Sequence, residues 1–372
     1  MTFCIITHVA HGNQSGEYFA YSPYVREMNI WAKYVDKIIL VAPLNLEQKT
    51  SIDIAYDHHN IDFRKVASFH FLSLTSAFKT LLALPRIAAE IYKAMKQSDH
   101  IHLRCPGNMG LLACLIQILF PSKPKTAKYA GNWDLKAKQP LSYRLQKWIL
   151  RNTFLTRNMQ VLVYGEWENS TKNIKPFFTA SYFEKDKIQV SPRVLTGKIS
   201  FVFVGTLSNG KQPLYAVQLI EQLYKKQYDV ELSIFGEGVE RASLESYITK
   251  NNLESIIFLK GNQNQSVIKE AYIKNHFVVL PSLSEGWPKV IAEGMFWGCL
   301  PIASRVSCVP NMLDNGNRGL LLEMRLANDV DQIESVLQDN NLYQTKVGNA
   351  IDWSRHYTLD IFETKIKQLL QS

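Results

Sequence analysis

Short apolar runs rich in β-branched and aromatic residues alternate with longer stretches of helical periodicity along the whole chain. In the first half the predicted strands are residues 2–8, 37–42, 67–72, 99–103, 126–130 and 159–164, and the predicted helices are 23–35, 77–96, 108–119 and 141–157. In the second half the predicted strands are 200–205, 229–235, 255–260, 276–281 and 299–303, and the predicted helices are 212–226, 238–251, 265–274 and 288–298. Such alternation indicates parallel sheets with helices on both faces.

Each half of the chain has enough strands for its own doubly wound sheet, so we predict an α/β fold with two Rossmann-like domains. We place an N-terminal domain at 1–190 and a C-terminal domain at 199–352, on either side of the polar stretch 184–198. The segment 353–372 has an amphipathic helical pattern with no strand after it, and we expect it to cross back to the N-terminal domain. With parallel sheets facing across a cleft, ligands are expected at the carboxyl ends of the strands.

The composition narrows the class of protein. The chain has 372 residues, of which 46% are hydrophobic, which suffices for two buried cores. Its longest apolar run, 109–120, is too short to span a bilayer, and the first residues, MTFCIITHVA, lack the basic region of a signal peptide. The five cysteines are scattered without a CxxC pair, which argues against a disulfide framework or a zinc knuckle. We therefore expect a cytoplasmic protein.

Positive charge is concentrated in one part of the chain. Residues 101–160 contain ten Lys and Arg residues and a single acid, Asp134, which indicates a polyanionic partner. No zinc-finger, RNP or helix-turn-helix pattern appears, so we do not expect nucleic acid. Because the bases are interleaved with apolar residues, an anionic membrane surface on the inner face of the cell membrane is a better candidate. The helix at 142–158 has two interpretations, an interfacial helix or a core-packed helix with a charged outer face.

The strongest chemical signal lies in the segment 280–304. A predicted strand is followed by a polar loop that contains Glu285, and a helix then begins at Pro288 and carries Glu293. Eight residues rotate a helix by about 80° beyond two full turns, so both carboxylates are expected to face one cleft. The free amides around Gly286 favour an anion. Two carboxylates beside an anion-binding helix end suit a ligand with both phosphates and hydroxyls, such as a nucleotide sugar.

This segment resembles the E-x7-E signature of retaining GT-B glycosyltransferases, particularly glycosyltransferase family 4. The flanking P-S, E-G-x-P, A-E-G-M and G-x-L-P-I-A-S also resemble the family, as do the segments 204–220, 234–241, 258–265 and 314–323, in the right order. The resemblance implies a GT-B fold and a hexosyltransferase-like enzyme. It implies retaining transfer of a sugar from a nucleoside-diphosphate sugar to a glycan or lipid-linked acceptor, as in surface polysaccharide synthesis.

Carried over to the matching positions, the resemblance implies that Glu293 binds the ribose hydroxyls of the donor and that Glu285 contacts the transferred sugar. It implies that Lys211 neutralises the diphosphate together with the backbone amides of Gly286 and Trp287. These groups take the place of a metal ion, so no metal and no cofactor are expected. The other expected donor-binding residues in this half are Gly205, Thr206, Gly236, Gly261 and Pro288.

Two departures from the family pattern concern the phosphate and sugar subsites. Thr206 stands where family members commonly have arginine, so another base such as Arg305 or Arg193 supplies that charge, or phosphate binding is weaker. The family's G-G-x-x-E is replaced by 307–311, which lacks both glycines and ends in Asn311. The departures indicate either adaptation to a different sugar or an impaired site.

The first half offers fewer candidates. The stretch HVAHGNQSGE contains Gly12 where the family has a glycine-rich loop near the donor phosphates, so Gly12 is expected to bind the donor. The stretch AGNWD places Asn132 and Asp134 where family members often have His-Asp near the reacting carbon. Asp134 is alternatively an internal counter-ion in this basic region. His8 and His11 are candidate acid–base groups or merely solvated loop residues.

Three other classes of function stay open. A nucleotide-sugar epimerase of the same fold would act without an acceptor. A non-catalytic nucleotide-sugar binding protein is suggested by the two departures at Thr206 and 307–311. A nucleic-acid binder would use the basic face, and competition by mild salt with no preference for sequence or length would reduce it to a nonspecific charge effect.

Overall fold

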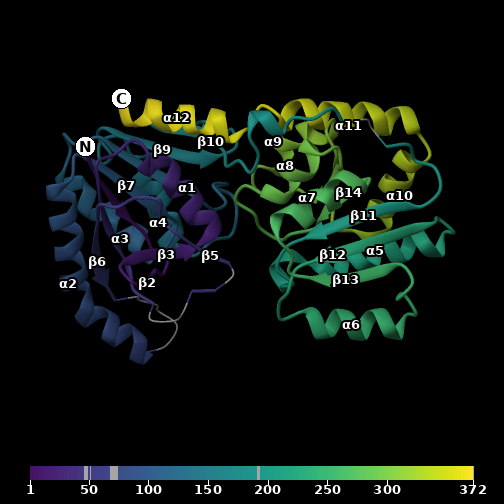
Figure 1. Ribbon diagram of the computed structural model, residues 1–372, viewed down its shortest axis with the longest axis horizontal. Helices are drawn as coiled ribbons and strands as arrows, with labels where there is room; N and C mark the ends of the chain where they lie inside the picture. Colours follow the sequence, from purple (N-terminus) through teal and green to yellow (C-terminus); the bar gives the residue numbers. More distant parts are fainter. Residues whose placement is uncertain (46–48, 51, 68–73, 191–192, 372) are drawn as a thin grey trace. The chain divides into compact units, whose positions relative to one another are not determined.

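The computed structural model describes residues 1–45, 49–50, 52–67, 74–190 and 193–371. The chain divides into two compact units, which we call unit 1 (Met1–Phe177 with Glu363–Ser372) and unit 2 (Phe178–Phe362) (Figure 1). Each unit is built around one parallel sheet, which confirms the predicted α/β class. The residues from Phe178 to Val190, which the sequence pattern placed in the first domain, are part of unit 2.

The sheet of unit 1 has seven strands in the order β10-β9-β8-β7-β1-β4-β6. The strands are β1 (Thr2–Ile6), β4 (Lys37–Pro43), β6 (Ile61–Val66), β7 (His100–Cys105), β8 (Lys125–Tyr129), β9 (Met159–Tyr164) and β10 (Ile174–Phe177), and neighbouring strands pair in parallel. β6 lies N-terminal to the predicted strand 67–72, and residues 68–72 of that prediction lie outside the described residues. β10 has no counterpart among the predicted strands, because its sequence IKPF contains a lysine and a proline.

The helices of unit 1 are α1 (Ser22–Ala32), α2 (Leu74–Gln97), α3 (Asn108–Ile116) and α4 (Leu141–Arg151), with a short 3-10 helix η1 (Gln117–Leu119) after α3. Alternate side chains of β1 show which helices cover which face. Phe3 stacks on Trp31 of α1, with ring centroids 5.5 Å apart. Its neighbour Cys4 belongs to the apolar core that contains Ile91 of α2 and Met109 of α3. α1 therefore covers one face of the sheet, and α2 and α3 cover the other.

Unit 1 also contains a small antiparallel sheet made of β2 (Gly12–Gln14), β3 (Glu17–Tyr21) and β5 (Asp53–Ala55). Ser15 and Gly16 join β2 to β3 with φ angles of 53° and 88°. Two successive positive φ angles are typical of the tight turns that connect hairpin strands. The sequence analysis expected a loop here and missed this hairpin.

The sheet of unit 2 has six strands in the order β13-β12-β11-β14-β15-β16. Its elements are β11 (Ile199–Val204), η3 (Asn209–Lys211), α5 (Pro213–Lys225), β12 (Val230–Phe235), α6 (Arg241–Lys250), β13 (Ile257–Gly261), α7 (Gln265–Lys274), β14 (Phe277–Leu280), α8 (Lys289–Phe296), β15 (Leu300–Ser304), α9 (Val309–Met312), η4 (Asp314–Gly316), β16 (Leu320–Leu322), α10 (Leu326–Leu337) and α11 (Asn340–Ser354). The strand pairs are parallel, so the carboxyl ends of all six strands lie at the same edge.

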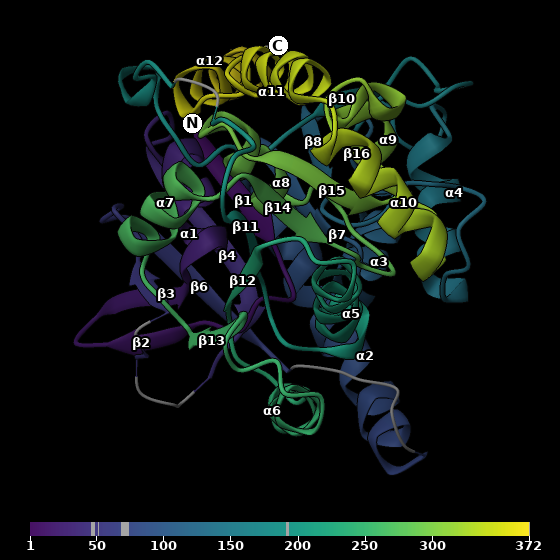
Figure 2. The ribbon, with the colours of Figure 1, turned by 90° about the vertical axis from the view of Figure 1, so that its right-hand side faces the viewer.

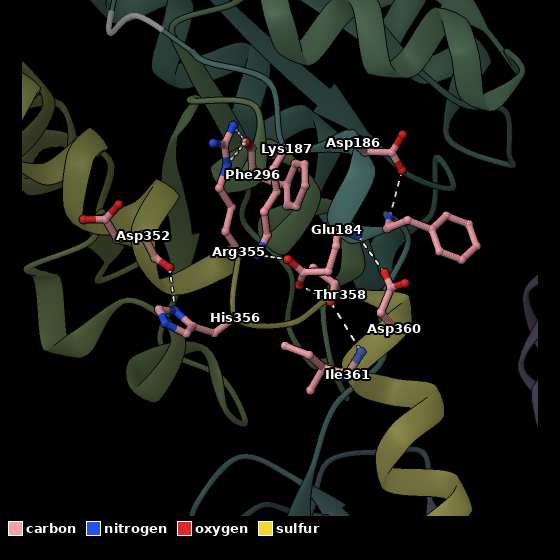
Figure 3. Close-up of polar contacts among 11 residues, drawn as sticks. Glu184, Asp186, Lys187, Phe296, Asp352, Arg355, His356, Thr358, Asp360 and Ile361 are labelled. Carbon is pink, nitrogen blue, oxygen red and sulfur yellow. Dashed lines mark hydrogen bonds and ion pairs between the residues drawn. The ribbon is translucent and has the colours of Figure 1, made fainter.

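The amphipathic pattern predicted at 353–372 corresponds to α12 (Leu359–Gln371), whereas α10 and α11 have no counterpart among the predicted helices. α11 ends at Ser354, and α12 begins after a turn. Figure 3 shows how this turn is fixed within unit 2: the Thr358 hydroxyl donates to Glu184 Oε1 at 2.7 Å, and the Glu184 N–H donates to Asp360 Oδ2 at 2.7 Å. Glu184 begins η2 (Glu184–Asp186), a 3-10 turn near the start of unit 2.

The last helix contributes to both units. Its residues up to Phe362 are counted in unit 2, and those from Glu363 onward are counted in unit 1. There, the Glu363 carboxylate accepts hydrogen bonds from Lys33 Nζ at 2.9 Å and from the Tyr34 hydroxyl at 2.8 Å, next to the end of α1.

No helix in the part of the chain that the structure describes is long and apolar enough to cross a membrane. All five cysteines are buried and free.

Candidate functional site

Glycine-containing loops from three neighbouring strands meet at the carboxyl edge of the unit 2 sheet. The Gly205 N–H, after β11, donates to the Phe235 carbonyl at 2.9 Å. The Gly236 N–H, after β12, donates to the Gly261 carbonyl at 2.9 Å. The structure therefore brings together the three glycines expected to bind the donor, and exposed Thr206 lies beside them.

Gly236 is the position where these loops require glycine. Its φ is +147°, and a Cβ atom there would lie 1.8 Å from the Gly205 carbonyl oxygen. A side chain would push apart the loops that follow β11 and β12, because backbone atoms cannot give way as a flexible side chain can. The close approach therefore packs the loops after β11 and β12 directly against each other at this edge of the sheet.

Lys211 and Glu285 form an ion pair at the same edge. The loop after β14 is tied to the loop after β11, since the Leu283 N–H donates to the Gly210 carbonyl at 2.9 Å. Lys211 Nζ then lies 2.6 Å from Glu285 Oε1. The Glu285 side chain is 8% exposed and that of Lys211 is 31% exposed, so the lysine is the more accessible partner. The two residues expected to act on phosphate and sugar are thus brought together.

Glu293 has different neighbours. α8 begins at Lys289, so Glu285 precedes the helix and helical rotation does not relate the two carboxylates. The Ser181 hydroxyl donates to Glu293 Oε1, and the Tyr272 hydroxyl donates to Glu293 Oε2 at 3.3 Å. The second glutamate of the signature therefore faces α7 and the segment around Ser181, and a cleft shared with Glu285 stays a prediction.

Trp287 has a buried side chain that belongs to an aromatic cluster. It stacks on Trp353 with ring centroids 6.0 Å apart, and it lies 5.3 Å from the ring of Tyr357. The Trp287 side chain is therefore used in packing, and the role that the resemblance implies for its backbone amide stays a prediction. Pro288 is buried and occupies the N-cap position of α8.

The segment that departs from the family pattern borders the Glu285 loop directly. The Gly286 carbonyl accepts hydrogen bonds from the Ser307 hydroxyl at 3.2 Å and from the Cys308 thiol at 3.0 Å. Burial raises the pKa of Cys308 to about 12, so this thiol stays protonated. Ser307 and Cys308 therefore hold the loop in place of the glycines found in the family.

Of the two arginines proposed to replace the missing one at Thr206, Arg193 has a structural role. Its guanidinium donates to the carbonyls of Tyr272, Ile273, Trp297 and Gly298 at the C-terminal ends of α7 and α8. A cation is favoured there because those carbonyls have no partner inside the helix. Arg305 is exposed and follows β15 directly, at the carboxyl edge of the sheet. Arg305 is therefore the better placed of the two.

No group of three or more His, Cys, Asp or Glu side chains among the described residues could hold a metal ion. The chain has one Asp-x-Asp pair, Asp329 and Asp331, on α10. Asp329 is buried, and it accepts hydrogen bonds from the Tyr215 hydroxyl and from the Glu323 N–H. This aspartate therefore fixes the start of α10.

The candidates His11 and Gly12 in unit 1 have structural roles. His11 is fully buried between the Val9 carbonyl and the Tyr56 hydroxyl, each 2.8 Å from a ring nitrogen. Burial lowers the pKa of His11 to about 4, so it is poorly suited to acid–base work near neutral pH. Gly12 lies in β2, and a Cβ atom there would lie 2.1 Å from the Phe19 ring. The packing in the hairpin is thus sufficient to require glycine at this position, and donor binding by Gly12 stays a prediction.

Asn132 and Asp134 lie in a loop after β8 that is held by its own side chains. Asn132 Oδ1 accepts from the Asp134 N–H at 2.8 Å, and Asp134 Oδ1 accepts from the Lys136 N–H at 2.8 Å. The buried Lys147 donates to the Asp134 carbonyl at 2.7 Å. Burial lowers the pKa of Lys147 to about 8, and the Asp134 charge opposes that shift. These contacts favour the interpretation of Asp134 as an internal counter-ion.

His8 lies near the carboxyl end of β1. A Cβ atom on Gly107, in the loop after β7, would lie 3.1 Å from His8 Nδ1, so the two loops meet at this edge of unit 1. Burial, and secondarily the charge of Arg104, lower the pKa of His8. Of the two histidines considered as acid–base groups, His8 is the one at the strand ends.

The sequence analysis missed Ser181 and Tyr272, the two partners of Glu293. Ser181 lies in an irregular segment that carries no motif, and Tyr272 lies in the last turn of α7. Neither position has a sequence signal that distinguishes it from ordinary polar or core residues.

The part of the chain that contains these loops matches a known protein family. Residues 184–353 match the family described as Glycosyl transferases group 1. This glycosyltransferase match contains Lys211, Glu285, Glu293 and the three glycines at the strand ends.

Two curated relatives show the extent of sequence similarity. An uncharacterized glycosyltransferase of Methanocaldococcus jannaschii is 30% identical over 36% of this chain and 38% of its own length. Protein CapJ of Staphylococcus aureus is 22% identical over 74% of this chain and 72% of its own length. Across the first four relatives the chain matches only 20% to 49% of the relative's length.

A solved structure extends the similarity to both units. HepE of Anabaena, in complex with UDP and glucose, covers 100% of this chain and 99% of its own with a TM-score of 0.69 and 15% identity. At 15% identity, the structural similarity establishes the fold alone. The chain has the GT-B fold of two Rossmann-like domains.

Proposed function

We propose that the chain is a glycosyltransferase that takes a sugar from a nucleoside-diphosphate sugar and passes it to a glycan or lipid-linked acceptor. The observation that carries the proposal is the Lys211–Glu285 pair, which lies beside the glycine loops at the carboxyl edge of unit 2. A cation and a carboxylate beside these loops together suit a ligand with a diphosphate and sugar hydroxyls. The family match over the same residues supports this assignment.

The donor contacts follow from the chemistry of each group. Lys211 attracts the diphosphate. Once that anion is bound, the positive charge of the lysine is shared between the diphosphate and the Glu285 carboxylate. The Glu285 carboxylate then accepts hydrogen bonds from hydroxyls of the transferred sugar. Glu293 accepts from the ribose hydroxyls in place of Ser181. Arg305 supplies further positive charge at the same edge.

We propose a retaining reaction that needs no metal. The bond between the anomeric carbon and the β-phosphate oxygen breaks, and the acceptor oxygen forms a bond to that carbon on the same face. The acceptor proton passes to the departing phosphate, which carries both electrons of the broken bond. Lys211 and the loop amides stabilise the charge that develops on this leaving group.

The first candidate donor contains uridine. HepE, which shares the fold, was solved with UDP and glucose, and this supports UDP as the first nucleotide to test. Retention, membership of glycosyltransferase family 4 and a role in surface polysaccharide synthesis belong to the same proposal, and they rest on the resemblance of the signature.

The proposal is tested by thermal stability with UDP, GDP, ADP and CMP, each with and without EDTA. A ligand at about 100 times its dissociation constant stabilises the folded chain by about 2.7 kcal/mol. We expect one diphosphate to raise the melting temperature equally in both conditions, and the anomer of the transfer product to be that of the donor. No shift with any nucleotide contradicts the proposal, and a shift without measurable sugar transfer favours a binding protein without turnover, the alternative suggested by Thr206 and Asn311.

A further inference from the structure

Helix α4 exposes an apolar stripe. Leu141, Leu145 and Trp148 are 77%, 43% and 60% exposed, and their spacing of four and three residues places them on one face of the helix. The opposite face buries Ile149 and Leu150 together with the polar Gln146 and Lys147. An ordinary surface helix has its apolar residues inside and its polar residues outside, so α4 departs from that pattern.

The stripe continues onto neighbouring elements. Phe154, just after α4, is 69% exposed, and Leu119 of η1 is 65% exposed. Gln117 of η1 donates to the Leu155 carbonyl at 3.0 Å, which holds η1 against the turn that carries Phe154. α3, with half-exposed Leu115, lies beside α4 (Figure 2). We call this surface the α4 surface and define its apolar part as Leu115, Leu119, Leu141, Leu145, Trp148 and Phe154.

Cations are interleaved with these apolar residues. Arg144 is exposed on the same helix face, one position before Leu145. The Arg157 guanidinium lies over the Phe154 ring, 4.6 Å from its centroid. The single acid of this part of the sequence, Asp134, has Oδ1 engaged by a backbone N–H. The α4 surface is therefore both apolar and strongly positive.

A basic groove adjoins the α4 surface. It has a volume of about 630 Å³ and lies at the amino ends of β7, β8 and β9. Three exposed cations line it, namely Arg157 next to Phe154, Lys172 and Lys175, whereas the Lys125 side chain is buried and donates to the Phe120 carbonyl at 2.6 Å. Its lining contains no Asp or Glu. A groove with three exposed cations and no carboxylate suits the phosphates of lipid headgroups.

We propose that the α4 surface docks on an anionic lipid bilayer, with Trp148 and Phe154 in the interface and the adjoining groove receiving headgroup phosphates. A Trp and a Phe among leucines, flanked by arginines, is the composition of an interfacial element that lies in the membrane plane. A second copy of the chain is a poorer occupant, because it would bring two strongly positive surfaces together. The inference does not depend on sugar transfer.

Vesicle flotation of the full chain tests the proposal without any sugar donor. We expect binding to vesicles of phosphatidylcholine with phosphatidylglycerol, weaker binding at high salt, and at least tenfold weaker binding to phosphatidylcholine alone. The double variant Trp148→Ser/Phe154→Ser should lower binding at least tenfold, and Arg144→Glu should lower it about fivefold. Tyr224→Ser, which changes a half-exposed aromatic residue in unit 2, is the matched control and should bind like the wild type.

Three results would overturn the proposal. The wild type could show no preference for anionic vesicles, or the double variant could bind as tightly as the control. Sedimentation without lipid could reveal a dimer that the double variant dissociates, which would assign the α4 surface to a second copy. Because all substituted side chains are exposed, unchanged unfolding midpoints should accompany each variant.

Discussion

Ser181 donates its hydroxyl hydrogen to Glu293, the second glutamate of the E-x7-E signature. The donor comes from an irregular segment near the start of unit 2, and the acceptor comes from α8. Under the proposed function, Glu293 is the carboxylate that binds the ribose of the donor. The Ser181 hydroxyl then occupies the carboxylate oxygen that a ribose hydroxyl needs as its acceptor. Ser181 therefore competes with the nucleotide for Glu293.

This competition predicts opposite effects for the two residues. Removing the hydroxyl in Ser181→Ala should tighten nucleoside-diphosphate binding by about fivefold, since a hydrogen bond of this kind is worth on the order of 1 kcal/mol. Glu293→Gln should weaken binding at least tenfold, because the charged acceptor is lost. Isothermal titration with the nucleotide identified by thermal stability measures both. Tighter binding by Glu293→Gln would contradict the assignment of Glu293.

The Lys211–Glu285 pair predicts a loss of turnover. Lys211→Met removes the cation that stabilises the leaving diphosphate, and Glu285→Gln removes the charge that orients the sugar. Each should lower kcat by roughly 10²- to 10³-fold, the usual cost of losing one preorganised electrostatic partner. Lys198→Met, which breaks a pair with Glu231 in which both side chains are accessible, is the control and should keep full activity. Activity within threefold of wild type for Glu285→Gln would remove that residue from the reaction.

Arg193 predicts a loss of stability rather than of ligand binding. Its guanidinium satisfies carbonyls at the ends of α7 and α8, so Arg193→Ala should destabilise unit 2 by roughly 3 kcal/mol. Arg193→Lys should recover part of this loss, because an ammonium cannot reach all of these carbonyls at once. Urea unfolding measures both variants. If Arg193→Lys folds normally yet loses nucleotide affinity, Arg193 acts on phosphate instead.

A side chain at position 12 should create a packing defect. Gly12→Ala places a methyl group against the Phe19 ring and should cost roughly 1–3 kcal/mol of stability in unit 1. The smaller side chain of Phe19→Leu should make the alanine less costly, and a double-mutant cycle measures that coupling. Without any coupling, the explanation of Gly12 by its contact with Phe19 would be incorrect.

Buried histidines predict acid sensitivity of unit 1. Burial holds the pKa of His11 and His100 at about 4 and that of His102 at about 3, below the ordinary value of 6.5. Between pH 6.5 and 4 the unfolded chain therefore binds more protons than the folded chain, and stability falls as the pH falls. In this range each histidine should change the free energy of unfolding by about 1.4 kcal/mol per pH unit. Urea unfolding at pH 7.5 and 5.0 tests this.

Variants separate the histidine effect from general acid destabilisation. His102→Gln removes one of the buried histidines. It should lower the pH dependence of the unfolding free energy by about 1.4 kcal/mol per pH unit, which is the contribution of one proton. His59→Gln, at an exposed position, is the matched control. Equal slopes for wild type and His102→Gln would argue that other groups cause the acid sensitivity.

The sequence predicted the central sheets because their strands are apolar runs, and it predicted the glycine loops and Lys211 because those residues lie in local motifs. It missed β10, β16 and the hairpin of β2 and β3, which are strands of only three to five residues, and it missed the helices α10 and α11. The relation between Glu285 and Glu293 could not be predicted, since it depends on where α8 begins. The partnership of Ser181 with Glu293 spans 112 positions and has no local signal. Long-range polar contacts of this kind are fixed by packing.

Unit 1 is assembled from two stretches of chain, and all of unit 2 is encoded between them. During synthesis on a ribosome, Met1–Phe177 is made first. Glu363, the partner of Lys33 and Tyr34, is added only after every residue of unit 2 has been translated. Unit 2 is continuous and is complete at Phe362. A nascent chain arrested just before position 363 would therefore hold a whole second unit and an unfinished first one.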